Sequence, residues 1–333
     1  MRAPRITTAD RAVARSVGAD CVMCASILLK VHRELFVPES AVSVFERLVW
    51  SEPPAGGQVL FDTACVLGGS IAGLLTARVL SDQVRQVVIV ERDEVSTDGR
   101  SHPGVPHDQH AAAANAVEGE QWIVTLAGYG NARPGRTMDA FRACCAKLPA
   151  VFADAASGAV TRDMATYRQA DSRRRHFTGL RHFPARLVGG GDAVASFNPV
   201  YGQGLSCAAL QASCLSSCLT GDPDVDSAAT DFFDLQQLVA DAAWTVSAGG
   251  DAARLDAANN VEVPEGARRQ RWAMEQVISA TVVDASIARA FGDVRVMLRH
   301  PDVLADPALL ERAVTANRVR QSPMLRPERT GVK

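Results

Sequence analysis

The chain has 333 residues, of which 47% are hydrophobic and 5% aromatic, and its formal net charge at pH 7 is −2. This length allows one large or two modest cores, and the nearly balanced charge disfavours nucleic acid or an anionic membrane as a general partner. Abundant alanine with few aromatic residues favours a helix-rich α/β or α+β protein.

The N-terminus is polar and lacks the apolar core and cleavage site of a signal peptide. We therefore expect a cytoplasmic protein with reduced thiols. Cys21 and Cys24 form a lone CxxC pattern without a second ligand pair, which disfavours zinc or redox chemistry. The longest apolar run, residues 21–29, is too short to cross a bilayer, so we expect no membrane span.

Residues 1–57 are predicted to form a helical N-terminal extension. Apolar residues at helical spacing predict a helix over residues 41–50, and the sequence from Pro53 to Gly57, PPAGG, marks a boundary. We find no chemistry in this segment.

Residues 59–95 predict a strand, a Gly-rich turn, a helix and a second strand. The first strand covers residues 64–67, the helix continues over 74–80, and the second strand, 86–90, ends at Glu91. A glycine at the tight turn, a glycine where the helix packs on the sheet and an acid at the tip of the next strand are typical of dinucleotide binding. Ser70 stands where the middle glycine of this fingerprint is usual. The alternative is an ordinary βαβ packing turn.

Residues 96–112 predict a polar loop containing His102, His107 and His110. Because only Asp108 could support these histidines, the spacing disfavours a metal site and favours contact with cofactor or solvent. The following residues predict a strand over 122–126, helical periodicity over 138–155 that is interrupted at Pro149, and an extended, arginine-rich segment over 167–183. We interpret the cluster Arg173–Arg175 as a solvated face or a strand end.

A second Gly-rich stretch follows the triplet Gly189–Gly191, in which propensity predicts only a weak strand. It runs from Gly191 to Gly204, GDAVASFNPVYGQG, and leads into a helix that ends near Leu219. Such a turn lets the backbone approach a ligand, with free N–H groups at the start of the helix. Further helices are predicted over 231–248, 268–291 and 307–319.

The two Gly-rich stretches together resemble the flavin-dependent monooxygenases typified by para-hydroxybenzoate hydroxylase, and in particular bacterial FAD-dependent oxidoreductases. The resemblance rests on VLGGSIAG at 66–73, ERD at 91–93, GVP at 104–106 with QH at 109–110, and the stretch 191–204. It extends from about residue 59 into the 320s. It implies FAD as cofactor, NAD(P)H as transient reductant, and a hydrophobic or aromatic small-molecule substrate.

By this resemblance, the glycines of the first turn would hold the FAD pyrophosphate and Glu91 the adenosine ribose. Arg92 and Arg100 would lie beside the adenosine and ribityl regions, Asp192 would bind a ribityl hydroxyl, and the second turn would cover the flavin ring. Catalytic side chains are not assigned, because the flavin carries the chemistry. The implied cofactor-binding residues are Gly68, Gly69, Ser70, Ile71, Ala72, Gly73, Glu91, Arg92, Arg100, Gly191, Asp192, Pro199, Gly202, Gln203 and Gly204.

The chain departs from this family in its middle. The Asp-Gly motif expected between the two turns is absent, since Asp98-Gly99 comes too early, and Ala195 stands where many relatives carry histidine or cysteine. Two alternatives therefore stay open: a truncated, non-catalytic member with weak or no FAD binding, serving a structural or interaction role, and an NAD(P)-dependent dehydrogenase that uses only the first turn.

The expected fold is α/β, with a Rossmann-like FAD-binding domain, a reduced substrate-domain sheet and a C-terminal helical region. After the extension, residues 58–112 and 184–220 would form the discontinuous FAD-binding domain. Residues 113–183 would be a remnant of the substrate domain, residues 221–320 the C-terminal helices, and residues 321–333 a disordered tail.

Overall fold

A computed structural model describes residues 40–51, 59–91, 106–107, 110–117, 121–166, 171–180 and 182–321. These residues belong to one unit that begins at Ser40. The predicted disordered tail over residues 321–333 begins at Gln321, which is helical, and the rest of it lies outside the described residues. The CxxC pattern, Arg92, Arg100 and His102 also lie outside them.

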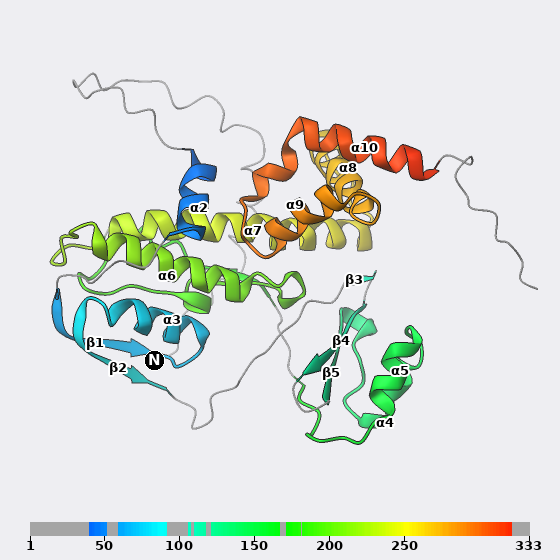
Figure 1. Cartoon of the computed structure of the whole chain (residues 1–333), viewed down its shortest axis with the longest axis horizontal. Coiled ribbons are helices and arrows are strands. Elements are labelled where there is room, and N and C mark those ends of the chain that lie inside the picture. Colours follow the sequence, from blue (N-terminus) through cyan, green and yellow to red (C-terminus); the bar gives the residue numbers. More distant parts are fainter. Residues whose placement is uncertain are drawn as a thin grey trace, which may run out of the picture. The chain divides into compact units, whose positions relative to one another are not determined.

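The first Gly-rich region folds as its sequence pattern predicts. Strand β1 (Phe61–Leu67) leads into helix α3 (Ile71–Leu80), and strand β2 (Val84–Val90) returns parallel to β1, with Val66 paired with Ile89. In Figure 1, α3 lies between this two-stranded sheet and helix α6 (Gly204–Thr220), with which it is in contact. This region is therefore a sheet layer covered by one helix layer.

The β1–β2 sheet is largely uncovered. Parallel sheets are normally buried on both faces, yet here β2 is exposed over most of its length and Leu67 of β1 is 81% exposed. Val66 at 7% exposure is the buried residue of β1. Within the described residues, the sheet is a two-stranded fragment, smaller than a Rossmann sheet.

A second, antiparallel sheet follows, with strand order β3–β4–β5. Strand β3 is Pro106–His107, β4 is His110–Val117 and β5 is Gln121–Gly128, and helices α4 (Met138–Cys145) and α5 (Ala150–Ser157) complete this segment. The prediction of a loop through residue 112 was wrong at its end, because the Ala-rich β4 pairs along its whole length with β5. Pairing overrides the low strand propensity of alanine, and the domain boundary drawn at residue 112 falls inside β4.

Helices form the main core. Helix α2 (Ala41–Val49), α6 and α7 (Thr230–Ala258) contribute to one hydrophobic cluster, in which Phe45 of α2 is completely buried. Although residues 1–57 were predicted to be an extension, α2 is thus part of the core. A second cluster is built by α8 (Glu265–Ala280), α9 (Ala285–Arg295), the 3₁₀ helix η4 (Pro301–Ala305) and α10 (Pro307–Gln321).

Two helix predictions were wrong in extent. The single helix predicted over 268–291 is split at Asp284, whose side chain accepts hydrogen bonds from the backbone N–H groups of Ser286 and Ile287 and so caps α9. The helix predicted to end at Ala248 continues through Gly249 and Gly250 to residue 258, although glycine disfavours helix interiors.

Short elements connect these layers. They are the 3₁₀ helices η1 (Gly130–Ala132), η2 (Gly191–Ala193) and η3 (Pro199–Tyr201), and the paired strands β6 (Arg173–Arg174) and β7 (Ala195–Ser196). The strand expected before Asp192 is not formed, since no ladder includes Arg186–Gly190. In the part of the chain that the structure describes, no helix is both long and apolar enough to cross a membrane.

Candidate functional site

The turn between β1 and α3 requires its glycines. Gly68 has φ of +115°, in the region that favours glycine, and its N–H donates to the carbonyl of Val90 at 2.8 Å. A Cβ placed on Gly73 would lie 1.8 Å from the carbonyl oxygen of Gly68. The turn and the first turn of α3 therefore approach each other more closely than any side chain would allow.

The side chain of the N-cap residue leaves the N-terminus of α3 uncapped. Ser70 occupies the N-cap position with extended backbone but makes no side-chain capping hydrogen bond. The first N–H groups of a helix have no partner within the helix and, together with the helix dipole, attract anions. The Ser70 side chain therefore satisfies none of the first N–H groups of α3.

Glu91 reaches the same turn from the end of β2. Its Oε2 accepts a hydrogen bond from the backbone N–H of Gly69 at 2.5 Å. The acid at the tip of the second strand thus lies beside the Gly-rich turn, and its carboxylate engages one N–H of that turn directly.

The second Gly-rich stretch is in contact with the first. Gly191 has φ of +59°, and a Cβ at this position would lie 2.6 Å from the Cβ of Ala72 in α3. Gly190 lies close to α3 as well, since its Cβ would be 3.9 Å from Oγ1 of Thr76. Asp192 follows directly and is exposed. Two stretches separated by more than a hundred residues therefore meet at the N-terminal half of α3.

Two buried glutamines, which the sequence analysis did not single out, hold the second stretch in place. Oε1 of Gln211 in α6 accepts a hydrogen bond from the N–H of Gly191 at 2.7 Å, and Nε2 of Gln236 in α7 donates to the carbonyl of Gly189 at 2.7 Å. Both side chains are at most 4% exposed. The sequence signal for this role was a glutamine on the buried face of an Ala-, Cys- and Leu-rich helix. A buried polar side chain needs a hydrogen-bond partner.

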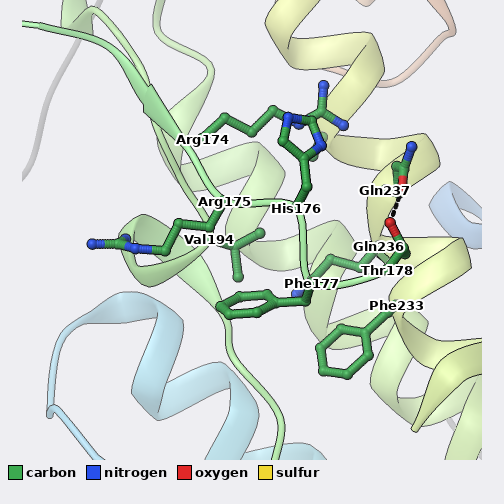
Figure 2. A pocket seen from close by; sticks show the side chains of 10 residues that line it. Arg174, Arg175, His176, Phe177, Thr178, Val194, Phe233, Gln236 and Gln237 are labelled. Carbon is green, nitrogen blue, oxygen red and sulfur yellow. Dashed lines mark hydrogen bonds between the residues drawn. The ribbon is translucent and has the colours of Figure 1, made fainter. Parts of the chain in front are cut away.

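The arginine cluster pairs with the second stretch, since Arg173 and Arg174 form a ladder with Ser196 and Ala195. Arg174 is mostly buried and pairs with Asp241 of α7 at 2.5 Å, so it is not a solvated residue as the sequence suggested, whereas the backbone of Arg173–Arg174 does form a short strand. Arg175 donates from its guanidinium to the carbonyl of Ala193 at 2.7 Å. Figure 2 shows Arg175 directed away from the side on which Arg174 and His176 lie.

The pocket of Figure 2 is too small for a substrate. It is lined by residues of the 174–178 segment together with Val194 and α7 residues such as Phe233 and Gln236. Its cavity volume is about 10 Å³, close to the least that admits one water molecule. This pocket is thus a small packing defect between the 174–178 segment, Val194 and α7.

The turn over Pro199–Gly204 ends at the N-terminus of α6. Gly202 has φ of +70°, Gln203 is 1% exposed and donates from Nε2 to the carbonyl of Arg295, and Gly204 has open space where a side chain would be. The side chain of Gln203, the N-cap residue of α6, makes no capping hydrogen bond. The N-cap side chains of α6 and α3 thus both leave the start of their helix uncapped.

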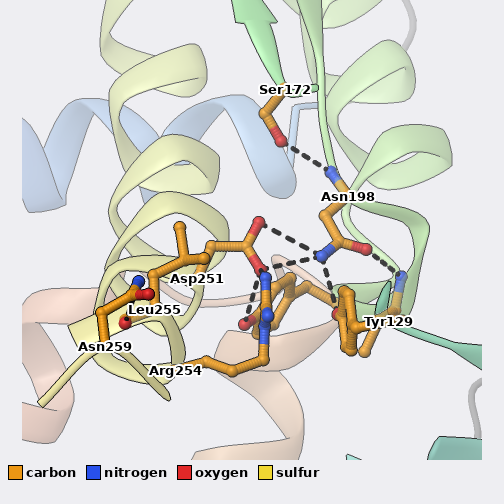
Figure 3. Close-up of polar contacts among 9 residues, drawn as sticks. Tyr129, Ser172, Asn198, Asp251, Arg254, Leu255 and Asn259 are labelled. Carbon is orange, nitrogen blue, oxygen red and sulfur yellow. Dashed lines mark hydrogen bonds and ion pairs between the residues drawn. The ribbon is translucent and has the colours of Figure 1, made fainter. Parts of the chain in front are cut away.

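A polar cluster fixes the beginning of this turn (Figure 3). Nδ2 of Asn198 donates to the hydroxyl of Tyr129 at 2.8 Å and to the carboxylate of Asp251 at 2.9 and 3.1 Å. The guanidinium of Arg254 lies 3.8 Å from the ring centre of Tyr129. Burial and the nearby Asp251 carboxylate raise the pKa of Tyr201, so its phenol stays protonated.

The remaining candidate groups are possible metal ligands and the cysteines of α6. Within the described ranges, no cluster of three or more His, Cys, Asp and Glu residues could hold a metal ion. Cys207 and Cys214 of α6 are buried, and burial raises the pKa of the Cys207 thiol to about 12.

Comparison with known proteins gives limited information. No protein-family model matches the chain. The chain is similar to "Protein Rv3254" of Mycobacterium tuberculosis, with 38% identity over 119 residues, which cover 35% of this chain and 25% of that protein. The matched region therefore spans about a quarter of the length of this curated relative, whose name states no activity.

Proposed function

We propose that this chain binds FAD across its two Gly-rich stretches and belongs with the flavin-dependent monooxygenases that resemble para-hydroxybenzoate hydroxylase. The observation that carries the proposal is the contact between Gly191 and Ala72, where a Cβ would come within 2.6 Å. A single ligand can bind both stretches only if they are adjacent. An ordinary packing turn in the first stretch would not require this contact with the second.

The first turn fits the pyrophosphate of the cofactor. Gly68, Gly69 and Ser70 would surround it, and the N–H groups of Ile71, Ala72 and Gly73 at the uncapped start of α3 would face its negative charge. The close approach at Gly73, 1.8 Å for an added Cβ, matches the packing role of the last glycine in dinucleotide-binding turns.

Glu91 and Asp192 are the acids that would hold the sugar hydroxyls. Glu91 already lies on the turn through its bond to Gly69, next to where an adenosine ribose would follow the phosphates. Asp192 is exposed and follows Gly191, which contacts Ala72 of α3, and it would accept a hydrogen bond from a ribityl hydroxyl. Pro199, Gly202, Gln203 and Gly204 would lie beside the flavin ring, and the α6 dipole would favour negative charge on its reduced form.

Bound FAD would supply the redox chemistry, accepting a hydride from NAD(P)H and passing electrons to oxygen for the oxidation of a hydrophobic or aromatic small molecule. The side chains named here would bind and orient the cofactor. Arg92 and Arg100 stay part of the proposal from sequence alone.

The first test is the visible absorbance of the purified protein before and after addition of FAD, with chromatography of any released cofactor. We expect a yellow protein that releases FAD. Glu91→Ala and Asp192→Ala should each weaken FAD binding about tenfold, the typical cost of one charged hydrogen bond. Glu275→Ala and Asp234→Ala, which remove exposed helix carboxylates elsewhere, should bind FAD like the parent protein. A folded protein that stays colourless in excess FAD would refute the proposal.

One observation favours the second candidate, a family member without catalytic activity. The β1–β2 sheet exposes Leu67, Val88, Ile89 and Val90, which a complete cofactor domain would bury. This candidate predicts a folded protein without flavin and without NAD(P)H oxidation. NAD(P)H binding without flavin would instead indicate the dehydrogenase alternative.

A further inference from the structure

The turn over Pro199–Gly204 is attached to α7 through an aromatic ring and a glycine. A Cβ added to Gly250 would lie 2.5 Å from both Cε1 and the hydroxyl oxygen of Tyr201. The ring of Tyr201 therefore lies directly on the backbone of α7 at this residue. Gly249, its neighbour, has open space where a side chain would be, so only one of the two glycines is required for the contact.

Asn198 provides a second attachment, through hydrogen bonds of its side chain and of its backbone N–H (Figure 3). Its side-chain amide donates to both carboxylate oxygens of Asp251, next to Gly250 in α7. The side-chain oxygen Oδ1 of Asn198 accepts a hydrogen bond from the N–H of Val200 at 3.2 Å. The backbone N–H of Asn198 donates to the hydroxyl of Ser172. The side chain of Asn198 thus connects α7 to the backbone of the turn itself.

The charges of the cluster are balanced by one arginine. Arg254, one helical turn after Asp251, has its guanidinium 3.4 Å from that carboxylate and stacks on the ring of Tyr129. Among the described residues, Nε of Arg254 is buried without a hydrogen-bond partner. The Asp251 carboxylate is contacted by the Arg254 guanidinium, the Asn198 amide and, at 3.5 Å, the Tyr201 hydroxyl, and these contacts orient it toward Asn198.

We propose that Asn198, Tyr201, Gly250 and Asp251 are positioning residues, which hold the Gly202–Gly204 backbone and the start of α6 in the geometry that accepts the flavin ring. This inference rests on the proposed FAD function. The four residues act through the turn, with two of them located on α7, more than forty residues away in sequence. This role explains Gly250 inside a 29-residue helix.

The first experiment compares Gly250→Ala with the matched control Gly249→Ala. FAD affinity is measured by quenching of flavin fluorescence, and melting temperature is measured without FAD. Gly250→Ala should displace Tyr201 and weaken FAD binding about tenfold or more, as small misplacements of binding groups do. Gly249→Ala should bind FAD like the parent protein. Equal affinity of the two variants would overturn the proposal.

A second experiment remains informative if Gly250→Ala does not fold. Asn198→Asp faces Asp251 with a second carboxylate and should loosen the turn, whereas Asn198→Asp combined with Asp251→Asn restores an amide–carboxylate pair of the same total charge. Hydrogen exchange of the peptide containing residues 199–206, measured without FAD, should be faster in the single variant and return to the parent rate in the double variant.

The two readouts separate the two proposals. If the parent protein does not bind FAD, the proposed function fails, while the exchange pattern still reports on the positioning role. If the parent binds FAD and the double variant recovers neither affinity nor exchange protection, the positioning role is refuted. Recovery of both in the double variant supports it, since general destabilisation would not be reversed by the swap.

Discussion

The two Gly-rich stretches differ in what supports them. The second is backed by buried side chains on several sides: Gln211 and Gln236 bind its backbone, and Val194 and Phe197 belong to the main hydrophobic cluster. The first is carried by a two-stranded sheet whose Leu67 is 81% exposed. One stretch is thus built into a helical core, and the other into a thin sheet held by one helix.

This difference indicates that the second stretch is stable without a ligand, whereas the stability of the first depends more on a ligand. A turn that is fixed by buried hydrogen bonds keeps its shape without a ligand. A turn on an exposed sheet gains most from anything that binds it, because a ligand that binds only the folded state adds directly to stability. FAD should therefore protect β1 and β2 from hydrogen exchange more than α6 and α7.

Thiol labelling should show the largest contrast. Cys65 on β1 is exposed, whereas Cys207 on α6 is 1% exposed and its pKa is raised to about 12. Because its pKa is raised, the Cys207 thiol stays almost entirely protonated near pH 8, and the thiolate is the reactive form. We expect Cys65 to be alkylated at least about a thousandfold faster, measured by mass spectrometry of each peptide. In denaturant the two rates should converge; similar rates in the folded protein would contradict the contrast.

Gly73→Ala should have the next largest effect. The added Cβ meets the Gly68 carbonyl oxygen at 1.8 Å, and such overpacking costs about 3 kcal/mol of unfolding free energy. Urea unfolding measures the loss. Gly266→Ala in α8, where the Cβ has open space, should be neutral or stabilising. Equal stability of the two variants would show that the first turn is not packed as described.

Gln211→Leu tests the support of the second stretch. It removes the acceptor of the Gly191 N–H, and a buried donor left without a partner costs about 2 kcal/mol. The free energy of unfolding, from urea denaturation, gives the value. Ser217→Ala, at an exposed position of the same helix, should change it by less than about 0.5 kcal/mol. A Gln211→Leu protein as stable as the parent would mean that the second stretch does not depend on this bond.

Leu67→Lys should have the smallest effect on stability. Because Leu67 is 81% exposed, the change should cost less than about 0.5 kcal/mol, within the usual range for surface positions. It should reduce aggregation on heating, measured by light scattering, since a charge protects an exposed strand edge. Val66→Ala, one residue earlier and 7% exposed, should cost about 2 kcal/mol. A large loss for Leu67→Lys would indicate that this face of the sheet is covered.

Local patterns predicted most of the helices and the strand–turn–helix–strand unit, because these depend on residues close in sequence. The Ala-rich β4 was missed, since only pairing with β5 makes it a strand. The end of α7 was missed because Gly249 and Gly250 look like a stop signal; the reason for Gly250 is the ring of Tyr201, about fifty residues earlier.

The sequence predicted the glycines and acids of the candidate site. It did not predict the buried glutamines that hold the site in place. Gly73 and Gly191 follow from a motif whose physical role is local. Gln211 and Gln236 become meaningful only when α6 and α7 are folded against the Gly189–Gly191 backbone. Whether FAD binds stays a prediction from the resemblance and the contact between the two stretches.

The length of α7 has a consequence for cooperativity. Its Phe232 and Val239 belong to the main hydrophobic cluster, and its Val246 packs against the cluster built by α8, α9 and α10. Losing either cluster would remove the apolar packing of about half of this helix, and a helical segment without such packing is marginal in water. We therefore expect the two clusters to unfold together, in a single calorimetric transition.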